Sequence, residues 1–164
     1  MSTDEPATFN APIDKQLTIF VDEHRRELAG CLDGLTEAEA RQQLVPSKTT
    51  LLGLVKHATF VERVWFQEAV TCEPRSKSGI EPGPDESFDL TDADTIESVR
   101  SKFLATCAAS ARAVEDLGLD HILDGNRRGP LPLRWVYLHV LRELAQHCGH
   151  ADILREQILA ARAA

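Results

Sequence analysis

The segment Tyr137–Asp152 contains three histidines and one glutamate at spacings that suit metal binding. On a helix of roughly 100° per residue, four polar positions fall within a sector about 80° wide: His139, Glu143, His147 and His150. Apolar residues lie within or beside the same sector: Val136, Val140, Leu144, Ala151 and Leu154. The stripe should therefore face the protein interior, where unpaired imidazoles and carboxylates are costly to bury. A bound metal ion would compensate these groups.

The spacing favours three of the chain's polar residues as metal ligands. Glu143 and His147 lie four residues apart, so both side chains project from one helix face and can reach one ion. His57 is the natural third ligand, because apolar residues at i−3, i+4 and i+7 place it on the buried face of its own helix. Two imidazole nitrogens and one carboxylate oxygen suit zinc, with nickel as an alternative. Three protein ligands leave a coordination position open, as in catalytic zinc sites.

Each of these residues also has a purely structural interpretation. His57 alone could be a hydrogen-bonded core histidine, and Glu143 with His147 could be a helix-surface pair worth a few tenths of a kcal/mol. His139 and His150 could replace one of the ligands, although we favour a role in orienting them or in lining the pocket. No residue stands out as a general acid, although His150 could serve as one.

Further candidates for substrate contact lie near the start of the last helix. Arg134, with Arg127 and Arg128 in the preceding loop, could meet an anionic substrate, or these arginines could form a solvated charge cluster. Trp65 could stack against a substrate or cofactor, or it could simply pack in the core.

The elements that must position these residues are helical. Apolar residues recurring at three and four positions predict four long helices, over 13–34, from Ser47 or Thr49 to about 70, from Asp92 or Asp94 to 118, and over 132–159. Thr36 and Glu39 form a capping-box pattern that opens a short additional helix. Prolines and glycines indicate long loops over 72–90 and 119–132. Strand patterns are absent, so we predict an all-α four-helix bundle.

Length and composition narrow the class of protein. The chain has 164 residues, 43% of them hydrophobic, which predicts one globular domain over 12–164 behind a flexible tail over 1–11. The net charge is −8 and basic residues do not cluster, which argues against nucleic acid and anionic membranes as partners. Four scattered cysteines, no signal sequence and no long apolar run predict a cytoplasmic protein with reduced thiols.

Several motifs together resemble the DinB/YfiT-like metalloenzyme superfamily. They are His57, the Arg-x-Trp-Phe motif at 63–66, Leu-Arg-Trp at 133–135, and the last-helix pattern Glu-x-x-x-His-x-Gly-His-x-Asp at 143–152. The chain most resembles the branch that includes mycothiol-dependent S-transferases and maleylpyruvate isomerase. Many members of the superfamily have histidine at the position of Glu143, whereas the isomerase type is similar to this chain in having glutamate.

The resemblance implies a four-helix bundle that holds a divalent metal through His57, Glu143 and His147, and commonly a homodimer. It also implies a low-molecular-weight thiol of the mycothiol type as co-substrate. We predict Arg134 and Trp65 as cofactor-binding residues and His150 as the catalytic residue. The metal would activate the thiol as thiolate, which attacks a small electrophilic substrate, in a transferase or isomerase reaction. Two alternatives stay open: a non-catalytic metal- or small-molecule-binding bundle with a stress-response role, and a metal-dependent hydrolase.

Overall fold

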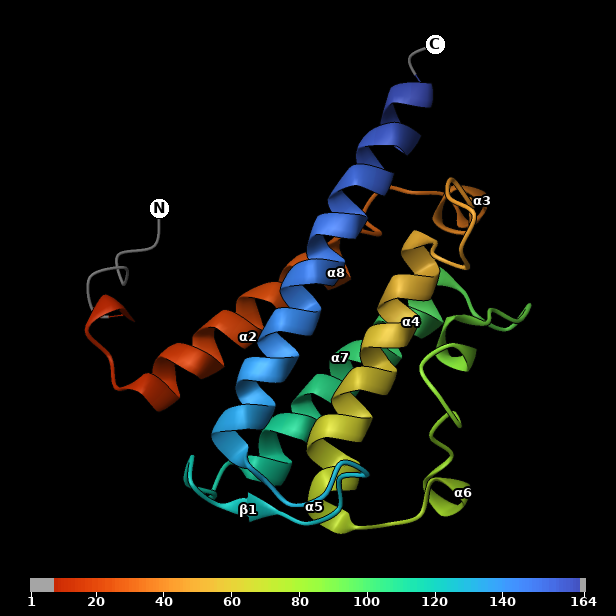
Figure 1. Ribbon diagram of the computed structural model, residues 1–164. Helices are drawn as coiled ribbons and strands as arrows, with labels where there is room; N and C mark the ends of the chain where they lie inside the picture. Colours follow the sequence, from red (N-terminus) through yellow and green to blue (C-terminus); the bar gives the residue numbers. More distant parts are fainter. Residues whose placement is uncertain (1–7, 163–164) are drawn as a thin grey trace.

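Four long helical segments dominate the computed structural model, which describes residues 8–162 (Figure 1). They are α2 (Ile13–Gly30), α4 (Leu51–Glu62) with its continuation, α7 (Ile96–Val114) and α8 (Leu133–Ala161). A π-helix, η1 (Arg63–Glu68), and a short α5 (Ala69–Thr71) prolong α4. The helix α2 packs against α8, while α4 packs against both α7 and α8. The predicted all-α four-helix bundle is confirmed.

Short elements fill the connections between the long helices. They are α3 (Glu37–Ala40), α6 (Arg75–Ser78), the 3-10 helix η2 (Glu86–Phe88), β1 (Ile122–Leu123) and β2 (Leu131–Pro132). The two strands form an antiparallel pair with Ile122 opposite Pro132 and Leu123 opposite Leu131. We predicted no strand; a pair of two-residue strands is too short to leave a period-2 pattern.

Capping side chains set the helix starts, and two of these starts differ from prediction. The predicted box at Thr36 and Glu39 is confirmed. Thr50, rather than Ser47 or Thr49, caps α4 by accepting a hydrogen bond from the Gly53 amide. Thr95 caps α7 in a box with Ser98, whereas we expected Asp92 or Asp94. A threonine directly before an apolar run can also cap a helix, because its hydroxyl oxygen accepts from a free amide of the first turn.

Two helix ends also lie earlier than predicted. The helix α2 ends at Gly30, and Gly34 follows in the left-handed region with φ of 69°. The helix α7 ends at Val114 rather than at Gly118. In both cases the apolar periodicity continues into a packed turn, because Leu32 and Leu117 still contact the core after the helix has ended.

The helix α4 runs through the middle of the bundle. All of its residues are buried except Lys56. Polar residues on this helix are therefore removed from solvent on every side, which makes His57 and Glu62 costly unless partners are provided. Their surroundings differ and define two separate polar clusters.

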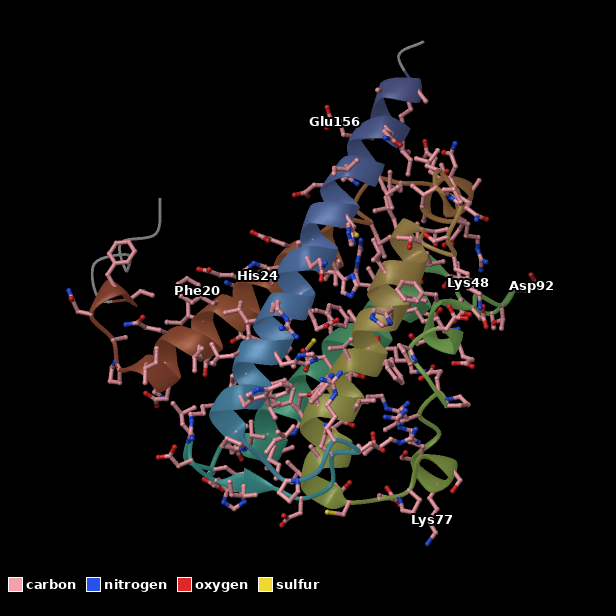
Figure 2. All side chains as sticks on the ribbon, in the orientation of Figure 1. Phe20, His24, Lys48, Lys77, Asp92 and Glu156 are labelled. Carbon is pink, nitrogen blue, oxygen red and sulfur yellow. The ribbon has the colours of Figure 1, made fainter. Side chains whose placement is uncertain are left out.

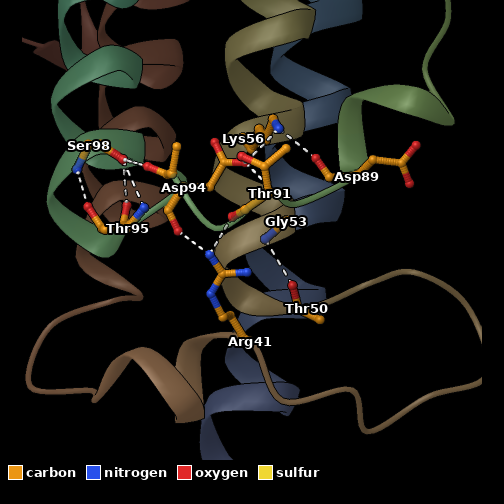
Figure 3. A network of polar contacts seen from close by, with 10 residues as sticks. Arg41, Thr50, Gly53, Lys56, Asp89, Thr91, Asp94, Thr95 and Ser98 are labelled. Atoms are coloured by element: carbon orange, nitrogen blue, oxygen red, sulfur yellow. Dashed lines mark hydrogen bonds and ion pairs between the residues drawn. The ribbon is translucent and has the colours of Figure 1, made fainter.

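The segment between α6 and α7 is fastened to α4 by a polar network (Figure 3). Lys56 Nζ donates to the carbonyl of Asp89 over 2.5 Å and pairs with the Asp94 carboxylate at 2.9 Å. Arg41 donates to the carbonyls of Thr91 and Asp94. Burial opposes ionisation of Asp94, but hydrogen bonds from Thr91 and Lys56 hold the pKa of this carboxyl below its ordinary value. The network fixes the chain just after η2, which carries residues of the candidate site.

Lys77 and Asp92 extend away from the bundle in Figure 2. All four cysteines are free. No helix within 8–162 is both long and apolar enough to cross a membrane. The predicted flexible tail falls largely on residues 1–7, outside the described part of the chain; Ala11, near its end, accepts a hydrogen bond from Gln16 of α2.

Candidate metal centre

His57 of α4 and Glu143 and His147 of α8 come together where these two helices pack. Each residue offers one ligand atom, and the three atoms lie within 4.8 Å of one another. The imidazole rings of His57 and His147 are 4.8 Å apart and nearly perpendicular. The structure thus brings together the three residues that the spacing singled out as ligands.

His147 has no hydrogen-bond partner for either ring nitrogen among the described residues, although both atoms are buried. Nearly all buried polar atoms in native proteins are satisfied, and an unsatisfied one costs about 1–3 kcal/mol. The nearest charged atom is Glu143 Oε2, at 3.6 Å from Nε2. An imidazole held dry beside a carboxylate and a second imidazole is suited to bind a cation.

His57 is oriented by Ser87 of η2. The Ser87 hydroxyl donates to the carbonyl of Pro84 over 2.5 Å, so its oxygen must accept from His57 Nδ1, which lies 2.7 Å away. The proton is therefore on Nδ1, and Nε2 keeps its lone pair for a ligand. Burial, followed by the neighbouring His147, lowers the pKa of His57 to about 4, so the ring is neutral at pH 7.

Phe88, next to Ser87, covers the other side of the same ring. Its ring stacks on His57 with centroids 4.2 Å apart and an interplanar angle of 13°. The loop over 72–90 therefore supplies both a hydrogen-bond acceptor and an apolar lid for His57. Sequence reasoning missed both residues, because the loop has no periodicity from which the orientation of a side chain could be inferred.

Glu143 lies between two histidines of its own helix. Contact with His147 is the main reason that the pKa of Glu143 is lowered, so the group is a carboxylate at neutral pH. Its Oε1 is 3.7 Å from Nε2 of His139. Arg142 donates to His139 Nδ1 over 2.8 Å, which leaves the His139 proton on Nε2, facing Glu143. His139 thus orients Glu143 and is less available as a ligand.

Two tryptophans hold His139 in place. The Trp135 ring stacks on it at 5.1 Å and 9°, and the Trp65 ring lies at 4.0 Å. Trp65 belongs to the π-helix η1, and π-helical turns are frequent at functional sites because the extra residue redirects side chains. Sequence periodicity gave no sign of this π-helix.

A pocket of about 360 Å³ opens beside the candidate ligands. His57, Glu143 and His139 line its inner end, and α4 and η1 supply an apolar wall of Phe60, Val61, Val64 and Trp65. Both long loops contribute the remaining lining: Arg75, Pro82, Gly83, Pro84, Asn126, Arg127 and Arg128. A dry metal site opening into such a pocket can bring a bound small molecule to the open coordination position.

Gly125 lets the second loop approach this pocket closely. A Cβ atom at this position would collide with the carbonyl oxygen of Glu68, and the Gly125 amide donates to the Ala69 carbonyl at 3.0 Å. Only glycine fits this contact. The close approach places the next three residues, 126–128, along the pocket.

A family comparison completes the description of the site. The sequence matches the family model for mycothiol S-transferases over residues 16–160. The protein belongs to this family. No significant match was found among curated proteins.

Solved structures agree with this family at the level of the fold. A conserved protein from Enterococcus faecalis aligns with a TM-score of 0.69 and 16% identity, covering 92% of this chain and 99% of that one. A DinB-like protein from Bacillus cereus ATCC 10987 aligns with a TM-score of 0.63 and 17% identity, covering 88% of this chain and 91% of that one. The resemblance to DinB-like proteins and mycothiol S-transferases is thus confirmed.

The remaining predicted site residues of this mycothiol S-transferase family member are placed less centrally. Trp65 lines the pocket, as a cofactor-binding role requires. Arg134 is exposed, pairs with Asp120 and does not line the pocket. His150 is exposed, with its ring 5.9 Å from that of His147, and it lines a different pocket with Val45, Ser47, Thr49, Ile153 and Leu154. The cofactor role of Arg134 and the catalytic role of His150 stay predictions.

Proposed function

We propose that this protein is a divalent-metal-dependent enzyme that uses a low-molecular-weight thiol of the mycothiol type, acting as an S-transferase or isomerase on a small electrophile. The observation that carries the proposal is the cluster of His57, Glu143 and His147 in a member of the mycothiol S-transferase family. The donor set fits a metal, because His147 has two buried nitrogens without partners in the part of the chain that the structure describes, and His57 presents a free lone pair. Zinc suits this set best, with nickel as the alternative.

The residues of the chain have distinct parts in this function. His57, Glu143 and His147 would hold the ion, which when bound lowers the pKa of a coordinated thiol and so supplies thiolate at neutral pH. Ser87 fixes the tautomer of His57, and His139 directs the carboxylate of Glu143. Phe88 covers one face of the His57 ring and Trp65 packs on His139, so both rings reduce contact with water beside the cluster, which strengthens electrostatic interactions there.

Metal content tests the first half of the proposal. Elemental analysis of protein purified without chelator should give one divalent ion per chain in the wild type and almost none in His57→Ala and His147→Ala. The matched control is His121→Ala, which removes an exposed loop histidine and should keep its metal. Equal metal content in all four proteins, each with intact helicity, would refute the site.

Thiol consumption tests the second half and separates the alternatives. The metal-loaded protein is mixed with a thiol and a panel of electrophiles, and free thiol is followed over time. Loss of thiol that requires His147 supports the transferase or isomerase. Product release from ester or amide substrates without thiol would indicate a hydrolase instead. Metal binding with no turnover of either kind would indicate a binding protein.

A further inference from the structure

The pocket beside the candidate metal centre is basic, although the protein as a whole is acidic. The chain has a net charge of −8, yet three arginines from two different loops line this one pocket. They are Arg75, Arg127 and Arg128. The mutual repulsion of these three positive side chains raises the energy of the folded protein, and a bound anion would reduce this repulsion.

Two of these arginines already share a carboxylate. Arg75 Nε lies 3.0 Å from both carboxylate oxygens of Glu68, and its side chain is largely buried. Arg127 lies 3.8 Å from the same carboxylate. One carboxylate, that of Glu68, therefore neutralises only one of the two guanidinium groups, and Arg75 and Arg127 together with Glu68 keep a net positive charge.

Arg128 has no ion-pair partner within residues 8–162 and is the cation most available to a ligand. Its guanidinium carbon lies 5.5 Å from the centre of the Trp65 ring, so the charge is held over the face of a pocket wall. Its backbone amide donates to the Asn126 side chain over 2.9 Å, which fixes the chain where the arginine projects.

The wall beneath Arg128 is apolar. Phe60, Val61, Val64 and Trp65 form a continuous surface along α4 and η1, and His57 and Glu143 lie at its inner end. A ligand that fills this space needs an apolar or aromatic body against the wall and a negative group toward Arg128. The volume of about 360 Å³ suits a molecule about the size of an aromatic acid.

We propose that this pocket binds a small carboxylate with an apolar or aromatic body, with its carboxylate paired to Arg128 and its body against Trp65. This inference rests on the proposed function: the molecule that carries the carboxylate is the electrophilic substrate, and the thiolate adds to an activated carbon–carbon double bond in its body. The sulfur–carbon bond forms as the π bond breaks, and the proton lost by the thiol is returned to the neighbouring carbon. Arg128 is then the residue that selects anionic over neutral electrophiles. The arginine cluster supplies the attraction, and the inner end of the pocket places the body of the ligand beside the candidate metal ligands.

The test is equilibrium binding of benzoate and of benzamide, its neutral counterpart, by titration calorimetry. Wild type should bind benzoate about tenfold more tightly than benzamide, because a charge-assisted pair is worth at least that much. Arg128→Gln should weaken benzoate binding about tenfold and leave benzamide unchanged. The control Arg26→Gln removes an exposed arginine of α2 outside this pocket and should change neither.

Equal affinity for the two compounds in wild type, or benzoate binding by Arg128→Gln that matches wild type, would overturn the proposal. The second result would also reveal a carboxylate bound directly to the metal, since that contact does not involve Arg128. The titration needs neither thiol nor turnover, and metal content is measured on the same samples. Failure of the proposed function would therefore appear in metal content or thiol consumption, and failure of this inference in the affinities for benzoate and benzamide.

Discussion

Two buried polar residues of one helix, His57 and Glu62, belong to clusters that differ in how completely their polar atoms are paired. His57 and Glu62 both lie on α4, at 5% and 0% exposure. Glu62 faces Arg25 of α2, whereas His57 faces Glu143 and His147 of α8. The protein supplies hydrogen-bond partners for the charged groups of the first cluster, whereas the second keeps ring nitrogens without partners within 8–162.

The Arg25 and Glu62 cluster is closed. Arg25 donates from Nε and Nη2 to the two oxygens of Glu62 over 2.9 and 2.6 Å, and from Nη1 to Asp22 over 2.8 Å. The guanidinium also lies 5.5 Å from the centre of the Phe66 ring. Burial alone would lower the pKa of Arg25, but the charge and hydrogen bonds of Glu62 raise it.

The histidine cluster is open. His147 has two buried ring nitrogens without partners within 8–162, and its Nε2 lies 3.6 Å from Glu143 Oε2. Satisfied buried charges hold helices in register, whereas unsatisfied ones are kept only where a ligand completes them. The contrast explains why two polar positions on one buried helix serve structure in one case and, by our proposal, metal binding in the other.

The largest expected loss of stability comes from removing the charge of Glu62, which pairs with Arg25. Glu62→Gln leaves the buried Arg25 guanidinium without its counter-charge, and we expect a loss of about 3–5 kcal/mol in the free energy of unfolding. Urea denaturation measures it. The control Glu156→Gln, at an exposed position of α8 labelled in Figure 2, should change stability by less than about 0.5 kcal/mol. A loss below about 1 kcal/mol for Glu62→Gln would contradict the closed cluster.

Removing the support of His57 should weaken metal binding. Ser87→Ala deletes the acceptor that fixes the proton on Nδ1, and such changes typically cost about 10- to 100-fold in metal affinity. Competition with a chelator of known affinity measures the metal affinity of each variant. Ser101→Ala, on the exposed side of α7, is the control and should bind as wild type. Equal affinities for the two variants would show that Ser87 does not orient the ligand.

Completing the open cluster with an apolar residue should stabilise the protein once the metal is removed. His147→Leu removes two unsatisfied buried nitrogens, so we expect a gain of about 1 kcal/mol in the free energy of unfolding in excess chelator. His57→Leu, the matched comparison, loses a satisfied hydrogen bond and should lose about 1 kcal/mol under the same conditions. If both variants are destabilised equally, His147 is satisfied in solution and the contrast fails.

The smallest expected effect on stability comes from an exposed ion pair, between Glu39 and Arg162. Hydrogen bonds from Arg162, and then from Thr36, lower the pKa of Glu39 to about 2. A depressed carboxyl pKa stabilises the fold above the ordinary value of 4.5, and this contribution is lost as pH falls from 4.5 toward 2. The difference in Tm between wild type and Glu39→Gln should therefore shrink over this interval. A constant difference would show that Glu39 is not paired in solution.

Much of the fold and the core of the site were predictable because helical periodicity carries both. The same spacing that buries Leu144 places Glu143 and His147 along one stripe, so the fold and the ligand row follow from one pattern. The apolar neighbours of His57 likewise placed it on a buried face. In a regular helix, the apolar residues three and four positions away indicate the face on which a side chain lies.

The parts that were missed depend on contacts between distant segments. Ser87 and Phe88 reach His57 from a loop that is held by Lys56 of α4 and by Arg41, which follows α3. Arg25 and Glu62 are charged residues within helical segments, and such residues normally indicate a solvated face. Trp65 faces the pocket through a π-helical turn, which a period of 3.6 residues cannot represent. No local pattern encodes these pairings.

Anomalous diffraction at the absorption edge of the bound metal tests the central claim most directly. Crystals of protein purified without chelator should show one strong anomalous peak between His57, Glu143 and His147, about 2.0–2.2 Å from one atom of each. A metal peak at any other place, or protein with all three side chains ordered and no peak between them, would contradict the account.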